Sequence, residues 1–163
     1  MIKTLSIIAL YYLAVGFYSV SAISTEGKTV SMATYKDKTV VIALVDAVNP
    51  DLAFLSKIGG IANTGLQVII QPLNDLSTAS ATEAKTVSKN LGSNVLVLKT
   101  AAFGSRDKAK GELIYWLANA DQNGHFQIDA VTANTVFVVS KDGELKSVLA
   151  GGFPDKALTE ALQ

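Results

Sequence analysis

The chain has 163 residues, of which 14 are basic and 14 are acidic, and it contains no cysteine. A chain with balanced charge and no basic cluster is not expected to bind nucleic acid. Redox chemistry based on thiols requires a cysteine thiolate, so its absence excludes peroxide reduction by a thiol and thiol–disulfide exchange. The length suits a single domain that buries a core without needing disulfides.

The first 22 residues have the pattern of a secretory signal peptide. Lys3 supplies a positive charge, Leu5–Tyr18 is almost wholly apolar, and Val20-Ser21-Ala22 offers small residues for cleavage. We therefore expect cleavage after Ala22, a folded domain at residues 23–163, and a secreted or periplasmic protein. An uncleaved anchor is the alternative, but the apolar run is shorter than the roughly 20 residues of a spanning helix. No membrane span is expected after cleavage.

The first half of the domain predicts two strands and a helix. Thr29–Ser31 predicts a short strand, and Thr39–Val45 is an apolar, β-branched run typical of a strand buried on both faces. Pro50 suits the first turn of a helix with Asn49 as its cap and Asp51 near the positive end of its dipole. The apolar residues of this helix recur at helical spacing: Leu52, Leu55, Ile58 and Ile61.

The second half alternates strands and helices and ends in a hairpin and a helix. The predicted elements are a strand at Leu66–Ile70 ending at Gln71-Pro72, a helix at about Thr82–Leu91 stopped by Gly92, a strand at Val95–Leu98, a helix at Lys108–Ala118, strands at Thr135–Val139 and Leu145–Leu149, and a helix from Pro154 through Ala161. Lys141-Asp142-Gly143 is a strong hairpin signal. The order predicts an α/β fold with helices between parallel strands.

Three segments resemble the glutathione peroxidases and peroxiredoxins. Gly27–Val41 (GKTVSMATYKDKTVV) resembles the segment that leads into their first central strand, and Asn134–Gly151 (NTVFVVSKDGELKSVLAG) resembles their late hairpin. Leu66–Asn74 (LQVIIQPLN) is similar to the glutathione peroxidase strand that ends in Pro-x-Asn. The resemblance covers nearly all of residues 23–163. It implies a thioredoxin-like, glutathione peroxidase-type three-layer sandwich with a mixed central sheet.

The catalytic positions implied by this resemblance hold other residues. Counted from the three segments, the peroxidatic residue, the glutamine, the tryptophan and the asparagine of the family fall on Asn49, Ala79, Thr132 and Ala133. The second cysteine falls on Leu73, and a slip of one residue would restore the asparagine as Asn134. The resemblance therefore implies the fold without the thiol chemistry, and no cofactor is expected.

Five polar residues follow the first two central strands: Asp46, Asn49, Asp51, Asn74 and Asp75. The carboxyl ends of neighbouring strands meet at one edge of an α/β sheet, where ligands usually bind. With Asn134 as a sixth candidate, these residues predict a site for a small polar ligand or a hard cation. The alternative is that they cap a helix and form turns. No calcium-loop spacing is present, so no metal is expected.

These patterns favour an exported thioredoxin-fold protein that binds an unknown protein or small molecule and is not a thiol enzyme. The alternatives are an enzyme of another class that uses Asp46 and Asp75, and a structural envelope or matrix protein. An open polar cavity near Asn49 would favour binding, whereas a filled one would favour a scaffold. His125 is expected in an exposed loop, and Trp116 is expected to pack against the sheet.

Overall fold

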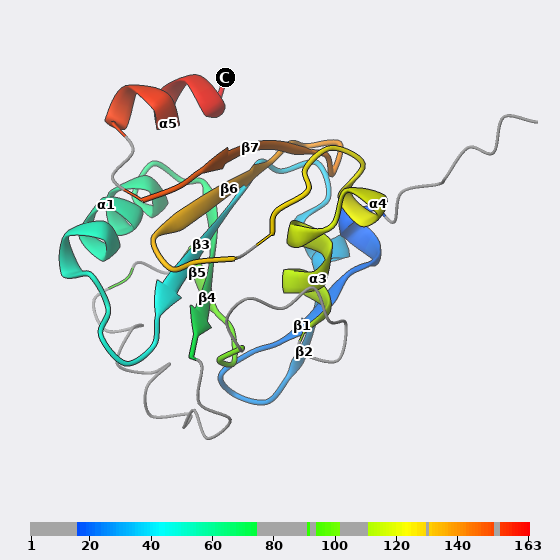
Figure 1. Ribbon diagram of the computed structural model, residues 1–163, viewed down its shortest axis with the longest axis horizontal. Helices are drawn as coiled ribbons and strands as arrows, with labels where there is room; N and C mark the ends of the chain where they lie inside the picture. The colour runs from blue at the N-terminus through cyan, green and yellow to red at the C-terminus, as the bar shows by residue number, and fades with distance from the viewer. Residues whose placement is uncertain (1–15, 75–90, 92–93, 102–110, 130, 152–153) are drawn as a thin grey trace, which may run out of the picture.

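A five-stranded mixed β-sheet lies at the centre of the molecule (Figure 1). The computed structural model describes residues 16–74, 91, 94–101, 111–129, 131–151 and 154–163. The strands are β3 (Val40–Asp46), β4 (Gln67–Leu73), β5 (Val95–Val97), β6 (Thr135–Val139) and β7 (Leu145–Leu149). Their order is β5-β4-β3-β6-β7, in which β3, β4 and β5 are parallel, whereas β6 is antiparallel to β3 and β7 to β6.

Strand β3 is buried on both faces because its apolar side chains alternate between two cores. One core contains Val40, Ile42 and Leu44. The other contains Val41, Ala43 and Val45. Successive side chains of a strand point to opposite faces, so a continuous apolar run can be buried only between two layers. The run predicted as a central strand is confirmed as one.

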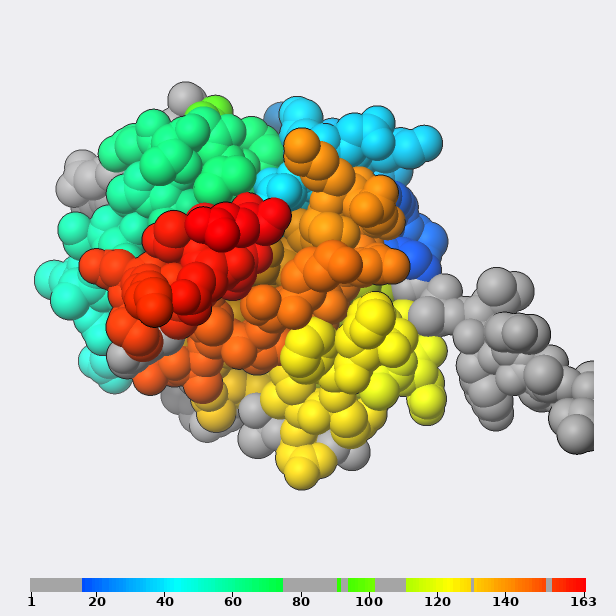
Figure 2. Space-filling view, turned by 90° about the horizontal axis from the view of Figure 1, so that it is seen from above, coloured from blue at the N-terminus to red at the C-terminus, as the bar shows by residue number. Residues whose placement is uncertain are grey.

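Helices cover both faces of the sheet. On one face lie α1 (Leu52–Ala62) and α5 (Asp155–Ala161), and Figure 2 shows α5 lying across this face beside α1 and β7. On the other face lie α3 (Glu112–Ala118) and α4 (Ala120–Asn123), with Trp116 buried in the core beneath them. The predicted α/β three-layer sandwich with a mixed central sheet is confirmed, as is the packing of Trp116.

A short hairpin near the amino terminus completes the α3 face. The 3-10 helix η1 (Phe17–Ser19) leads into β1 (Ser21–Ile23), which pairs antiparallel with β2 (Thr29–Ser31) before the 3-10 helix η2 (Met32–Tyr35). Residues 16–22 are therefore part of the folded domain in this structure. The cleavage point expected after Ala22 falls inside strand β1.

Helix α1 begins two residues later than the sequence pattern predicts. Its N-cap is Asp51, whose Oδ1 accepts hydrogen bonds from the backbone N–H of Ala53 at 2.9 Å and of Phe54 at 3.0 Å. These bonds satisfy backbone donors that have no partner inside the helix. The prediction that Asn49 is the cap is wrong, since Asn49 and Pro50 both precede the helix.

Strand β4 continues beyond the predicted end at Gln71-Pro72, as far as Leu73. Proline lacks the N–H that a central strand would donate, which is why it predicts a strand end. Here the backbone oxygen of Pro72 accepts from the N–H of Ala101 at 2.9 Å, at a point where β5 has already ended. The missing donor of Pro72 therefore costs no hydrogen bond of the β4–β5 ladder.

Two predicted helices are only partly visible in the described residues. The helix at Thr82–Leu91 and its stop at Gly92 lie outside them, except for Leu91, which is partly buried against the α1-side core. The helix predicted from Lys108 begins at Glu112 in the described part of the chain, and residues 108–110 are outside it.

Helix α4 was not predicted. The buried side chain of Asn123 ties it to α3, because Nδ2 donates to the backbone oxygens of Trp116 and Phe126, both at 2.9 Å. The helix ends at Gly124, whose φ of 80° is the left-handed conformation typical of a glycine stop. His125 follows in an exposed position, as predicted. Of the helices that the structure describes, none is both long and apolar enough to cross a membrane.

Candidate functional site

The polar residues at the carboxyl edge of the sheet mainly hold their own loops in place. Asp46 ends β3, and its Oδ1 accepts from the backbone N–H of Val48 at 2.8 Å and of Asn49 at 2.9 Å. A carboxylate that accepts two amide hydrogens of the next residues forms a local turn. The chain can therefore leave the sheet sharply and reach the start of α1.

Asp51 and Asn134 are brought together across this edge. The Nδ2 of Asn134 lies 3.5 Å from Oδ2 of Asp51, while Oδ1 of Asp51 caps α1. Asn134 has a φ of 59° just before β6, and its backbone N–H donates to the oxygen of Leu44 at 2.8 Å. The contact joins the start of α1 to the start of β6.

The remaining predicted residues differ in their surroundings. Asn49 is exposed, whereas Asn74 is only 6% exposed at the end of β4, where its backbone N–H donates to the oxygen of Ala101 at 2.8 Å. Thr132 is exposed, and its hydroxyl lies 3.3 Å from that of Thr135. Asp75 and Ala79 lie outside the described residues, and Ala133 is half-buried in the turn before β6.

The chemistry of this edge is that of capping and turn formation. In both Asp46 and Asp51, one carboxylate oxygen accepts hydrogen bonds from two backbone N–H groups. Among the residues that the structure describes, no three His, Cys, Asp or Glu side chains are grouped so that they could hold a metal ion. A ligand site at this edge of the sheet stays a prediction from the sequence.

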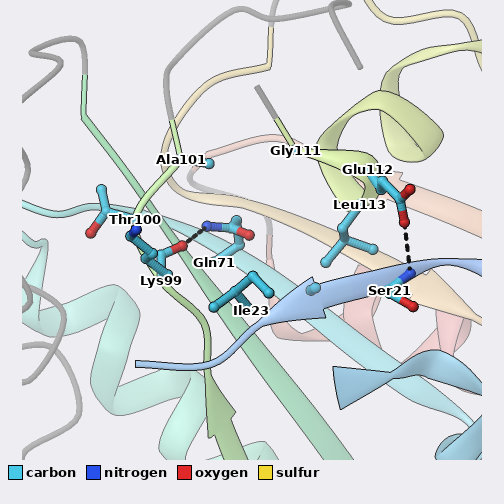
Figure 3. Close-up of a pocket in the computed structure, with 10 residues that line it drawn as sticks. Ser21, Ile23, Gln71, Lys99, Thr100, Ala101, Gly111, Glu112 and Leu113 are labelled. Atoms are coloured by element: carbon cyan, nitrogen blue, oxygen red, sulfur yellow. Dashed lines mark hydrogen bonds between the residues drawn. The ribbon is translucent and has the colours of Figure 1, made fainter. Parts of the chain in front are cut away.

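A pocket of about 420 Å³ lies elsewhere, on the α3 face of the sheet. Figure 3 shows it between β1, the end of β4, the segment that follows β5 and the first turn of α3. Its lining includes Ser21, Ile23, Gln71, Lys99, Glu112 and Leu113. This volume lies in the range of about 300–1,000 Å³ that small-molecule sites occupy.

Gln71 places a fixed hydrogen-bond acceptor in this pocket. The residue is only 4% exposed, and its Nε2 donates to the backbone oxygens of Pro72 at 2.9 Å and of Lys99 at 2.8 Å. Two carbonyl partners require the amide nitrogen on that side, so the orientation of the amide is determined. The Oε1 atom then points away from Lys99, and Gln71 is part of the pocket lining (Figure 3).

Glu112 supplies a second acceptor, which is negatively charged. Its Oε2 accepts from the backbone N–H of Ser21 at 3.2 Å, so the carboxylate is held against β1 (Figure 3). Ile23, which is 41% exposed, and the buried Leu113 add apolar surface. The hydroxyl of Thr100, also in the lining, is buried and has no hydrogen-bond partner among the residues that the structure describes. The pocket therefore suits a ligand that combines a hydrogen-bond donor with a small apolar group.

None of these pocket residues was predicted from the sequence to line a binding site. Gln71 appeared only as the end of a strand, and Glu112 only as one residue of a helix. The available signal was a long polar amide, Gln71, within the apolar part of the strand Gln67–Leu73, because a buried amide must find partners. The identity of those partners depends on the chain near Lys99, 28 residues away.

Comparison with solved structures shows what this architecture is similar to. The glutathione peroxidase-like protein Trgpx in its apo form matches with a TM-score of 0.66 and 12% identity, over 91% of this chain and 94% of its own. BsSco, of the Sco family of cytochrome c oxidase assembly proteins, matches with a TM-score of 0.61 and 11% identity, over 91% and 92%. The fold is thioredoxin-like.

A third similar structure is a secreted Mycobacterium tuberculosis disulfide oxidoreductase homologous to E. coli DsbE. It has a TM-score of 0.53 and 13% identity, over 89% of this chain and 95% of its own. No protein-family model matches the chain, and no curated protein matches it by sequence. At identities this low the comparisons establish the thioredoxin-like fold alone, because one fold can carry many functions.

Proposed function

We propose that this protein is an exported thioredoxin-fold domain that binds a small ligand and has no thiol redox activity. The lack of any cysteine removes the atom on which thiol redox chemistry depends. The amino-terminal sequence has the charge and the apolar run of a secretory signal, and one structural neighbour is described as secreted.

The observation that carries the binding proposal is the Oε1 atom of Gln71, oriented toward the pocket by two hydrogen bonds on its other side. Because Gln71 is almost entirely buried, a partner can reach this acceptor only through the pocket. A preorganised polar group in a partly apolar cavity is the usual basis of small-molecule specificity. Together with the Glu112 carboxylate it favours ligands with an amine or amide N–H group.

The two alternatives from the sequence have less support. An enzyme of another class would need Asp46 as a free ligand or base, yet one oxygen of Asp46 is already occupied by two backbone N–H groups. A purely structural protein would have no reason to keep an open cavity with two acceptors aimed at it. The binding function therefore accounts for more of the described geometry.

A matched set of probes tests the ligand class: benzylamine, benzamide and benzoate. They share a phenyl ring and differ in the group offered to Gln71 and Glu112. Titration followed by NMR should show larger shifts at pocket residues with benzylamine and benzamide than with benzoate, which the Glu112 carboxylate repels even though Lys99 lines the same pocket. Preferential binding of benzoate, or the absence of shifts with all three, would contradict the proposal.

Replacing Glu112 by Gln tests the role of the charge. The variant keeps an acceptor for the N–H of Ser21 but loses the charge-assisted bond, which is worth about 1.5–3 kcal/mol, so benzylamine should bind about tenfold more weakly or worse. Benzamide binding should change less. Glu160→Gln on α5, an exposed acid on the opposite face, is the control and should leave both affinities unchanged.

A further inference from the structure

Phe17 is built into the core of the domain. Its side chain is fully buried, and its ring centroid lies 5.2 Å from that of Trp116 and 5.8 Å from that of Tyr18. Val20, one turn later, is 4% exposed and belongs to the same core on the α3 face of the sheet. A chain that began at Ile23 would leave a void beneath α3 where these two side chains now pack.

The backbone of the same segment is also bonded to the rest of the fold. The oxygen of Val20 accepts from the N–H of Met32 at 3.0 Å, and strand β1 pairs Ser21 with Ser31 and Ala22 with Val30. The hydroxyl of Tyr18 donates to the backbone oxygen of Lys141, in the hairpin between β6 and β7. Removal of residues 17–22 would leave only Ile23 of β1 to pair with β2.

The sequence upstream of Phe17 contains a second cleavage pattern. Ala14-Val15-Gly16 places small residues at the first and third positions before Phe17, as signal peptidase requires, and Lys3 provides the positive charge. The apolar stretch Leu5–Leu13 that precedes it is within the usual length of about 7–15 residues. Gly16 itself is exposed and has no heavy atom near the position of a side chain.

We propose that signal peptidase hydrolyses the Gly16–Phe17 bond, so that the exported protein begins at Phe17 and keeps its η1–β1 segment. Water adds across this peptide bond, leaving a carboxylate on Gly16 and an ammonium group on Phe17. The proposal rests on export, which is part of the proposed function, and moves the boundary of the leader from Ala22 to Gly16. The mature domain is then residues 17–163.

The test is the amino-terminal sequence of the exported protein. The full chain, with a purification tag at its carboxyl end, is expressed in a bacterial host, and the protein outside the cytoplasm is identified by sequencing and intact mass. We expect it to begin Phe-Tyr-Ser-Val. Exported protein beginning Ile-Ser-Thr-Glu would overturn this inference while leaving export intact, whereas unprocessed chain confined to the cytoplasm would overturn the export proposal as well.

Two substitutions separate the two cleavage points. Gly16→Leu should block processing and cause the precursor to accumulate at least tenfold, because the position before the cut must be small. Ala22→Leu should leave processing unchanged, since the residue then lies inside the mature chain. The readout is the precursor-to-mature ratio, which is set before the domain folds. The reverse result, with Ala22→Leu blocking processing, would overturn the inference.

Discussion

At the level of single residues, the hairpin between β6 and β7 depends on Gly143. Its φ is 81°, a left-handed conformation that side chains with a Cβ adopt only with strain. A Cβ at this position would also lie 2.9 Å from Cε2 of Tyr18, so the space as well as the backbone angle requires glycine. The strong turn signal in the sequence therefore has a second cause, the contact with Tyr18, that only the structure shows.

Replacing Gly143 by Ala should lower the free energy of unfolding by about 1–3 kcal/mol, from backbone strain and the Tyr18 contact. Urea denaturation measures this change. Gly60→Ala is the control: Gly60 lies in α1, where an added Cβ meets nothing within 4 Å, so alanine should stabilise by up to about 1 kcal/mol. A Gly143→Ala protein as stable as the wild type would show that the turn is not constrained as described.

At the level of secondary structure, helix α1 has two neighbouring candidates for its N-cap, and the structure shows which of them caps it. Asn49 and Asp51 are both good capping residues. Asp46 holds the N–H of Asn49 in its own turn, and this leaves the helix to begin after Asp51. Asp51 also contacts Asn134, which lies just before β6 and 83 residues away in the chain.

Asp51→Ala should therefore destabilise the protein by about 0.5–2 kcal/mol, the usual cost of removing an N-cap side chain. Asn49→Ala should change stability by no more than about 0.5 kcal/mol, because Asn49 is exposed and outside the helix. Thermal and urea denaturation of the two variants gives the comparison. A larger loss of stability for Asn49→Ala than for Asp51→Ala would mean that Asn49 caps the helix, as predicted from the sequence.

At the level of the whole molecule, two cores are assembled around one sheet, and the α3-side core is completed by the amino-terminal segment. Phe17 lies in that core with Trp116, although nearly one hundred residues separate them in the chain. The sequence presents Phe17 only as part of an apolar leader. Its position in the core follows from the pairing of β1 with β2, which places η1 over the sheet.

Phe17→Ala should lower the free energy of unfolding by about 3–5 kcal/mol, because it removes a fully buried aromatic side chain. Ile23→Ala should cost much less, since Ile23 is 41% exposed. Denaturation curves of both variants against the wild type measure the difference. Equal small losses would mean that the segment before Ile23 is not part of the cooperative fold.

Much of the fold could be predicted from local patterns. Thr39–Val45 could be recognised because a short run of β-branched apolar residues is typical of a strand covered on both faces. The hairpin could be recognised because Asp142-Gly143 suits a tight turn. The candidate site could not be predicted in this way. Gln71 becomes a pocket acceptor only because its amide nitrogen donates to the carbonyl of Lys99. Glu112 becomes one only because Ser21 of β1 lies beside it and donates to its carboxylate.

The sequence by itself therefore determined the α/β class, the central strands and the impossibility of thiol redox chemistry. The first two are set by side-chain periodicity and the third by composition, and none needs knowledge of distant contacts. The tertiary structure decided which segments pack beside one another. It thereby decided which residue caps α1, where the pocket lies, and that Phe17 belongs to the core, since each depends on contacts between residues far apart in the chain.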